Sequence, residues 1–145
     1  RSPRIDGFTF LRGWEKIRNW SRSLRQVDEQ MWVVDVPMLP STGGRAAGRL
    51  NKLLVTRYLK WCLKRTGLHQ PTVLTTIPHV PRLLGDIGQR GLIYYCTDDF
   101  SHWPSADQAA LAAAERELCE QSDIVLAVSD ELLRRHQQTS KCVFF

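Results

Sequence analysis

Short apolar runs alternate with longer amphipathic blocks along most of this chain. The runs cover residues 31–36, 72–76, 92–96, 124–128 and 142–145, and they have the length and the β-branched or aromatic content of strands. Helix-like blocks lie at about residues 45–66, 107–121 and from 129 onward. Strands that alternate with helices are typical of βαβ units. The pattern therefore predicts an α/β fold class with a doubly wound parallel sheet, which is incomplete because the chain ends inside the last predicted strand.

The clearest predicted helix covers residues 45–66, and Gly67 is a natural stop for it. Its apolar residues recur at intervals of three and four, namely Leu50, Leu53, Leu54, Tyr58, Trp61 and Cys62. Its other face is basic and contains Arg45, Arg49, Lys52, Arg57, Lys60 and Lys64. A basic amphipathic helix can lie on an anionic lipid surface, and it can equally be a solvated surface helix.

Two other stretches carry weaker helical signals. A short amphipathic basic helix is expected within residues 1–30, where helical spacing relates Trp14, Ile17, Trp20 and Leu24. Residues 82–90 predict a short helix and a turn, although their glycines weaken the helix.

The net charge of +5 is unevenly distributed along the chain. Residues 45–65 contain seven Lys or Arg and no acid, whereas residues 97–131 contain nine acids and one Arg. The basic part raises the alternative of a nucleic-acid binder. The acidic block would repel phosphate and no nucleic-acid recognition motif is present, so we expect no nucleic-acid partner.

The spacing of the cysteines and the absence of known motifs limit the metal and cofactor sites that the sequence predicts. The four cysteines have no short Cys-Cys spacing and no paired spacing with the four histidines, so we expect reduced core thiols, a cytoplasmic protein and no metal site. No glycine-rich phosphate-binding motif occurs, and no cofactor is expected. No apolar run approaches the ~18 residues of a membrane-spanning helix.

Polar residues with chemical potential follow the predicted strands. Asp98 and Asp99 end the run at 92–96, and His79 and His102 lie in loops after strands. Ligands of open parallel sheets bind beyond the carboxyl ends of the strands. Adjacent residues in extended chain point opposite ways, so one Asp, with Asp99 favoured, is expected to face a cleft as a general base.

Purely structural roles for the same residues stay open. Aspartates commonly satisfy the amide groups of a turn, and a loop histidine is commonly incidental. Ser129 suits the N-cap of a helix, since no Gly-x-Ser-x-Gly motif surrounds it. Glu115 and Glu117 lie in the middle of a predicted helix, where solvated positions are expected.

An ordered series of short motifs lies within residues 92–133. It runs through Tyr94-Tyr95-Cys96-Thr97-Asp98-Asp99, then Glu115-Arg116-x-Leu118, then Ser122-Asp123-Ile124-Val125-Leu126-Ala127-Val128-Ser129, and Leu132. The order and spacing of these motifs resemble the N-terminal half of GT-B-fold glycosyltransferases in the broad family 4-like group. The resemblance extends more loosely over most of the chain.

The resemblance implies that residues 1–145 are a fragment of an N-terminal, Rossmann-like acceptor domain. In that family a first strand precedes this part of the domain, and a C-terminal domain binds the nucleotide-sugar donor. The implied activity is transfer of a sugar from that donor to a hydroxyl acceptor, such as a lipid-linked or polysaccharide acceptor. Asp99 or Asp98 would act as base, and His79 and His102 would help to bind the acceptor.

Two further expectations follow from this interpretation. The basic helix, through Arg45, Arg49, Lys52, Lys60 and Lys64, would make peripheral contact with an anionic membrane at its inner face. The chain alone would neither bind a nucleotide sugar nor catalyse sugar transfer. The alternative function is a non-catalytic Rossmann-like binding or interaction module.

Overall fold

The structure is a computed structural model of the 145-residue chain. It describes residues 23–36, 38, 45–100, 108–137 and 142–144. The chain divides into two compact units, residues 1–67 and 68–145, and each is described by itself.

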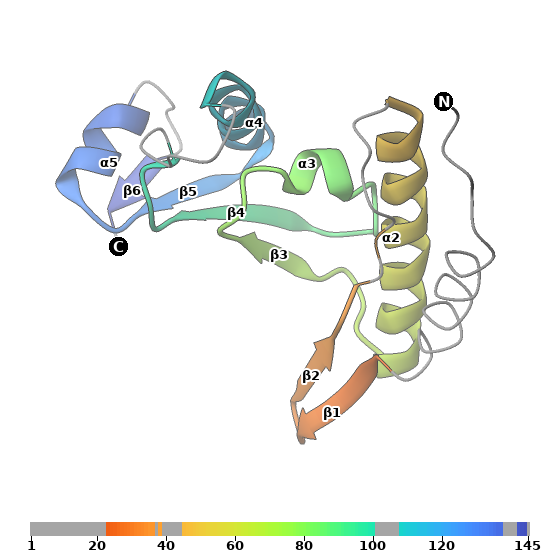
Figure 1. The fold of residues 1–145 in the computed structure, drawn as a ribbon. Helices are drawn as coiled ribbons and strands as arrows, with labels where there is room; N and C mark the ends of the chain where they lie inside the picture. Colours follow the sequence, from red (N-terminus) through yellow and green to blue (C-terminus); the bar gives the residue numbers. More distant parts are fainter. Residues whose placement is uncertain (1–22, 37, 39–44, 101–107, 138–141, 145) are drawn as a thin grey trace, which may run out of the picture. The chain divides into compact units, whose positions relative to one another are not determined.

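The second unit is a parallel α/β sheet. Four strands lie in the order β3 (Thr72–Thr75), β4 (Gly91–Cys96), β5 (Ile124–Ala127) and β6 (Cys142–Phe144), and every pair is parallel. The connections contain α3 (Val80–Leu83), α4 (Gln108–Gln121) and α5 (Asp130–His136). All three helices lie on the same side of the sheet (Figure 1). The predicted parallel α/β fold and the positions of these four strands are confirmed.

The core of this unit lies between the helices and one face of the sheet. Tyr94, Cys96, Val125 and Ala127 occupy alternate strand positions and are fully buried. They pack with residues of α4 and α5, namely Leu118, Cys119 and Leu132.

Within this unit, the opposite face of the sheet carries apolar side chains that its own helices leave uncovered. Leu74, Ile124 and Val143 are 58%, 41% and 48% exposed. The strand order follows the chain without a reversal among the described strands, so successive crossovers of one hand place their helices on one face.

Two polar residues fix the junction between α4 and β5. The Ser122 hydroxyl is fully buried and donates to the Leu118 carbonyl at 2.7 Å, which closes the end of the helix. The Asp123 backbone N–H donates to the Leu92 carbonyl at 2.8 Å, and Asp123 Oδ2 accepts from the Leu92 N–H at 2.8 Å. The Ser-Asp pair of the sequence motif thus sets where β5 begins beside β4.

Ser129 caps α5, as the sequence predicts. Its hydroxyl oxygen accepts a hydrogen bond from the Leu132 N–H at 3.3 Å, while Asp130 and Glu131 occupy the first turn. Acidic residues are favourable there because the helix N-terminus carries partial positive charge. This cap fixes α5 at the carboxyl end of β5, where the candidate site lies.

The first unit contains a β-hairpin and a long helix. The hairpin pairs β1 (Leu24–Asp28) with β2 (Met31–Val34) in antiparallel fashion. The helix α2 (Arg45–Thr66) ends before Gly67, whose φ of +71° suits a helix stop at glycine. The predicted helix at 45–66 is therefore confirmed.

Two predictions for residues 24–36 are wrong. Leu24 was predicted to lie in an amphipathic helix and is in β1, and the predicted strand at 31–36 pairs with β1 rather than within the parallel sheet. A local turn explains both, since Asp28 Oδ1 accepts from the Glu29 N–H at 2.7 Å and Gln26 donates to the Glu29 carbonyl at 3.2 Å. The rest of that predicted helix lies outside the described residues.

The helix predicted within residues 82–90 is also displaced. The helix α3 occupies Val80–Leu83, and residues 84–90 are irregular. Gly88 has a φ of +79°, and its N–H donates to Asp86 Oδ1 at 2.7 Å. This side-chain-stabilised turn replaces the helical bonds that the sequence pattern predicted.

Candidate functional site

A cleft lies beyond the carboxyl ends of β4 and β5. Its volume is about 500 Å³, and it is lined by Thr97, Asp98, Asp99, Ser129, Glu131, Leu132 and Arg135. This is the position at which parallel sheets bind their ligands. Among the described residues, three carboxylates line the cleft against one guanidinium, so this part of the lining is acidic and rich in hydrogen-bonding groups.

The two adjacent aspartates at the end of β4 differ in their surroundings. Asp98 is exposed, and its Oδ2 accepts a hydrogen bond from the Thr97 hydroxyl at 3.1 Å. Asp99 Oδ1 is bound by Nη1 of Arg135, and both side chains are 31% exposed. The structure therefore brings both predicted residues to the cleft, one open to solvent and one in an ion pair.

Beneath the cleft, Arg135 also binds a buried carboxylate. Its Nη2 donates to Glu115 Oε2 at 3.2 Å, and the Glu115 side chain is 5% exposed. The Tyr94 hydroxyl donates to Glu115 Oε1 at 2.9 Å. Burial, together with the nearby Glu115 charge, strongly raises the pKa of Tyr94. Arg135 thus joins a carboxylate of the cleft to a carboxylate of the core.

Glu115 is buried, which corrects the expectation of a solvated position. The sequence held a signal for this: Glu115 falls within the buried stripe of α4, whose members are Leu111, Ala114, Glu115, Leu118 and Cys119. Intervals of three and four residues place all of them on one face of the helix. A charged residue in phase with such a stripe needs a partner inside the core.

His136 of α5 lies next to Glu115, between two cysteines. Its Nε2 is 3.7 Å from Cys96 Sγ and 3.7 Å from Glu115 Oε1, while its Nδ1 is 3.6 Å from Cys119 Sγ. Burial lowers the pKa of His136, although the Glu115 charge acts in the opposite direction. Burial raises the pKa of Cys96, and raises that of Cys119 to about 12.

These residues form a cluster that the sequence analysis missed. Donor atoms of Cys96, Glu115 and His136 all lie within 4.8 Å of one another. The three residues come from β4, α4 and α5, so no local motif spacing relates them. The expectation of no metal site rested on such spacings.

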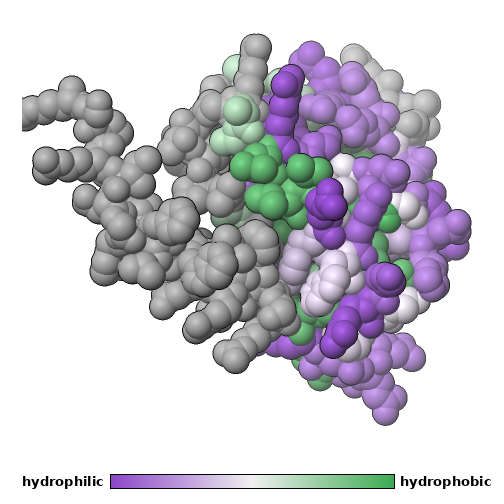
Figure 2. Space-filling view, turned by 90° about the vertical axis from the view of Figure 1, so that its right-hand side faces the viewer, coloured by the Kyte–Doolittle hydropathy of each residue, from purple (hydrophilic) through white to green (hydrophobic). Residues whose placement is uncertain are grey.

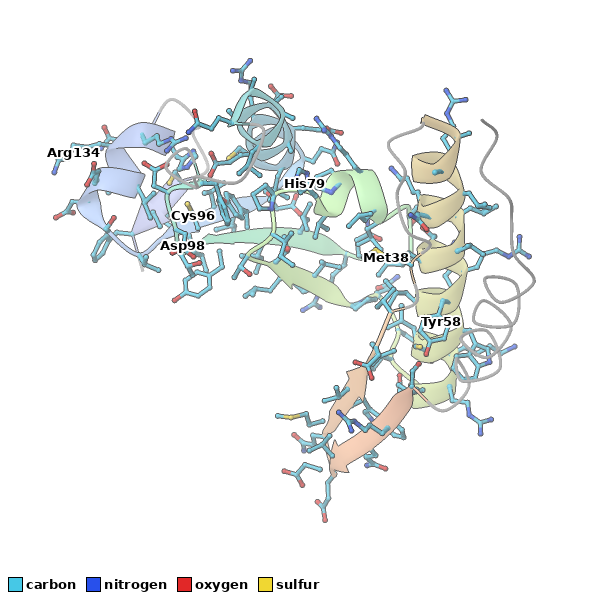
Figure 3. All side chains as sticks on the ribbon, in the orientation of Figure 1. Met38, Tyr58, His79, Cys96, Asp98 and Arg134 are labelled. Carbon is cyan, nitrogen blue, oxygen red and sulfur yellow. The ribbon has the colours of Figure 1, made fainter. Side chains whose placement is uncertain are left out.

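The predicted acceptor-binding residue His79 does not line the cleft. His79 is exposed at the N-cap of α3, makes no capping bond through its side chain, and is not among the residues that line the cleft. Figure 3 shows it away from Cys96 and Asp98. His102 lies outside the described residues.

The basic helix presents both charged and apolar side chains. Arg49, Lys60 and Lys64 are exposed, and Lys52 is half-buried. Arg45 begins α2, but its side chain lies outside the described part. Exposed apolar residues on this helix are Leu50, Leu53 and Trp61, at 45%, 53% and 40%. Within the described residues, no helix is long and apolar enough to cross a membrane.

Comparison of the chain with known families and with curated proteins gave no match. Functional inference therefore depends on the geometry above and on the motif resemblance.

Removal of the Arg135 guanidinium should destabilise the second unit. The change Arg135→Met leaves the Glu115 carboxylate buried without its cation, and we expect the free energy of unfolding to fall by about 3 kcal/mol. Arg134→Met is the matched control, since Arg134 is exposed on the same helix and its Nε donates to the Asp130 backbone carbonyl at 3.2 Å. It should change stability by less than about 0.5 kcal/mol. Urea unfolding compares the two, and equal effects would contradict this role of Arg135.

Proposed function

We propose that this chain is the acceptor-side domain of a glycosyltransferase and that its cleft binds the hydroxyl groups of a sugar acceptor. The observation that carries the proposal is the composition of the cleft at the carboxyl ends of β4 and β5. Carboxylates, a serine and a threonine line it, and these groups accept and donate hydrogen bonds to hydroxyls. The motif series of residues 92–133 supports the same reaction class.

The acidic lining favours a neutral acceptor over a nucleotide sugar in this cleft. A diphosphate would meet the carboxylates of Asp98, Asp99 and Glu131. The guanidinium that the described lining contributes, that of Arg135, already binds Asp99 and Glu115. A domain that binds the nucleotide-sugar donor would therefore face this cleft from elsewhere in a longer protein, and closure of the two would bring acceptor and donor together.

Within this proposal, Asp98 is the base. The sequence favoured Asp99, but Asp99 is held by Arg135, whereas Asp98 is exposed at the cleft. The Asp98 carboxylate would accept the proton of the acceptor hydroxyl as the hydroxyl oxygen bonds to the sugar carbon of the donor. The nucleotide would leave with the electron pair of the broken bond. Asp99 and Arg135 would position the loop that carries Asp98.

The open face of the sheet supports the finer assignment to one half of a GT-B fold. A doubly wound parallel sheet has helices on both faces, whereas α3, α4 and α5 cover one (Figure 1). The exposed Leu74, Ile124 and Val143 are the side chains that a second layer of helices would cover. A structure of a longer form of this protein with this face in solvent would contradict the assignment.

A non-catalytic binding module is the second candidate. It is favoured by the ion pair between Asp99 and Arg135, which engages the carboxylate that the sequence favours as the base. Such a module would bind a saccharide in the same cleft without transferring a sugar. The activity of the unaltered protein, measured together with its saccharide binding, separates the two functions.

Contact with an anionic membrane forms a further part of the proposal. On α2, the exposed cations Arg49, Arg57, Lys60 and Lys64 lie among exposed Leu50, Leu53 and Trp61. Helices that lie in a membrane interface combine such side chains. Apolar and hydrophilic side chains also lie next to each other on the surface in Figure 2. A lipid-linked acceptor would be found at such a membrane.

Substitution of the cleft aspartates tests the role of Asp98. In the protein that joins this chain to a donor-binding domain, Asp98→Asn should lower the rate of sugar transfer by about 100- to 10,000-fold, because the amide keeps the shape but loses basicity. Asp99→Asn should cost roughly 1 kcal/mol of stability and little rate. Asp130→Asn is the control, as Asp130 is exposed on α5 and outside the cleft lining. A rate of sugar transfer in the Asp98→Asn variant equal to that of the wild-type protein would refute the role of Asp98 as base. A wild-type protein that binds a saccharide but transfers no sugar would favour the binding module.

Vesicle binding tests the membrane contact. Each exposed cation should contribute about 1 kcal/mol at an anionic surface, so the chain should cosediment with acidic phospholipid vesicles and dissociate at high salt. The double change Lys60→Ala and Lys64→Ala should weaken binding by at least tenfold, whereas Arg134→Ala on α5 should leave it unchanged. Equal binding to neutral vesicles, or equal loss in the control, would contradict an electrostatic contact through α2.

A further inference from the structure

We propose that Cys96, Glu115 and His136 form a binding site for a zinc ion beneath the cleft. The three donors are a thiol sulfur, a carboxylate oxygen and an imidazole nitrogen, which are the ligand types that zinc takes in proteins. They are 0%, 3% and 8% exposed as residues. The argument for this site does not rest on the proposed function, because none of the three residues lines the cleft.

The distances between the donor atoms fit a single ion. Zinc bonds of about 2.3 Å to sulfur and about 2.0–2.1 Å to nitrogen, at tetrahedral angles, place neighbouring donors roughly 3.5 Å apart. His136 Nε2 is 3.7 Å from Cys96 Sγ and 3.7 Å from Glu115 Oε1, and the third pair lies within 4.8 Å. Closing the set around zinc would bring the donors closer together by up to about 1 Å, and water would take the fourth position.

The surrounding residues orient the donors as the outer ligands of metal sites do. His136 Nδ1 lies 3.6 Å from Cys119 Sγ, so an N–H on Nδ1 can donate to that sulfur while the Nε2 lone pair faces Cys96 and Glu115. Arg135 binds Glu115 Oε2 at 3.2 Å and leaves Oε1 toward the ion. Tyr94 donates to the same Oε1 at 2.9 Å, which an oxygen with two lone pairs accommodates.

The alternative is a hydrogen-bonded cluster without metal. In that arrangement the Cys96 thiol would donate to His136 Nε2 over the same 3.7 Å. The two states differ in sulfur chemistry, since zinc binds the thiolate and the hydrogen-bonded cluster keeps the thiol. A spectroscopic probe of the Cys96 sulfur therefore distinguishes them.

The test uses the full chain, freed of metal by a chelator and then titrated with Zn²⁺ or Co²⁺. We expect one equivalent of either ion to bind, a thiolate-to-cobalt charge-transfer absorption, and a rise in Tm of about 5–10 °C at a hundredfold excess of Zn²⁺ over Kd. Cys96→Ser and His136→Gln should each weaken binding more than about tenfold. Cys62→Ser, the same change at a buried cysteine of α2, should not alter it.

Two results would overturn the proposal. One is a cobalt complex of the unaltered chain without thiolate charge transfer, which would indicate binding to other histidines or carboxylates. The other is zinc affinity in Cys96→Ser equal to that in Cys62→Ser. If the Cys96 variant fails to fold, His136→Gln takes its place, and zinc affinity in that variant equal to that in Cys62→Ser would overturn the proposal.

Discussion

The buried carboxylate of Glu115 is the constraint on which the candidate site depends. A charged group in the core is stable only when other groups compensate it, and Glu115 is bound by Tyr94 of β4 and Arg135 of α5. Arg135 then reaches the cleft and binds Asp99. One core residue thus ties strand, helix and cleft together, and it leaves Asp98 as the exposed carboxylate at the end of β4.

Local sequence patterns predicted most of the helices and strands, whereas the partners of the buried Glu115 could not be predicted from them. Parallel β3 to β6 and the helices α2, α4 and α5 follow from local hydrophobic period, turn residues and caps, which short stretches of sequence encode. The pairing of β2 with β1 was missed because an apolar run does not specify its partner. Asp98 and Asp99 were placed at the cleft because they directly follow a strand.

The features that the sequence did not predict are contacts between residues that lie far apart in the chain. Glu115 and Arg135 are 20 residues apart, and Cys96 and His136 are 40 residues apart. No motif spacing reports such pairs, since the parallel register of β4 and β5, with α4 packed on β4 and α5 packed on β5, creates them. The ion pair of Asp99 could not be foreseen for the same reason. It is this pair that shifts our assignment of the base from Asp99 to Asp98.

The central claim is that the acidic cleft binds neutral sugar hydroxyls, and titration of the chain with saccharides, followed by NMR, tests it most directly. Neutral oligosaccharides, including at least one that the full protein glycosylates, should shift the amide signals of residues 97–99 and 129–131 in a saturable way. A nucleoside diphosphate should leave them unchanged, because the carboxylates of the lining repel phosphate. Saturable shifts of these signals by the diphosphate, with none caused by any saccharide, would contradict the account.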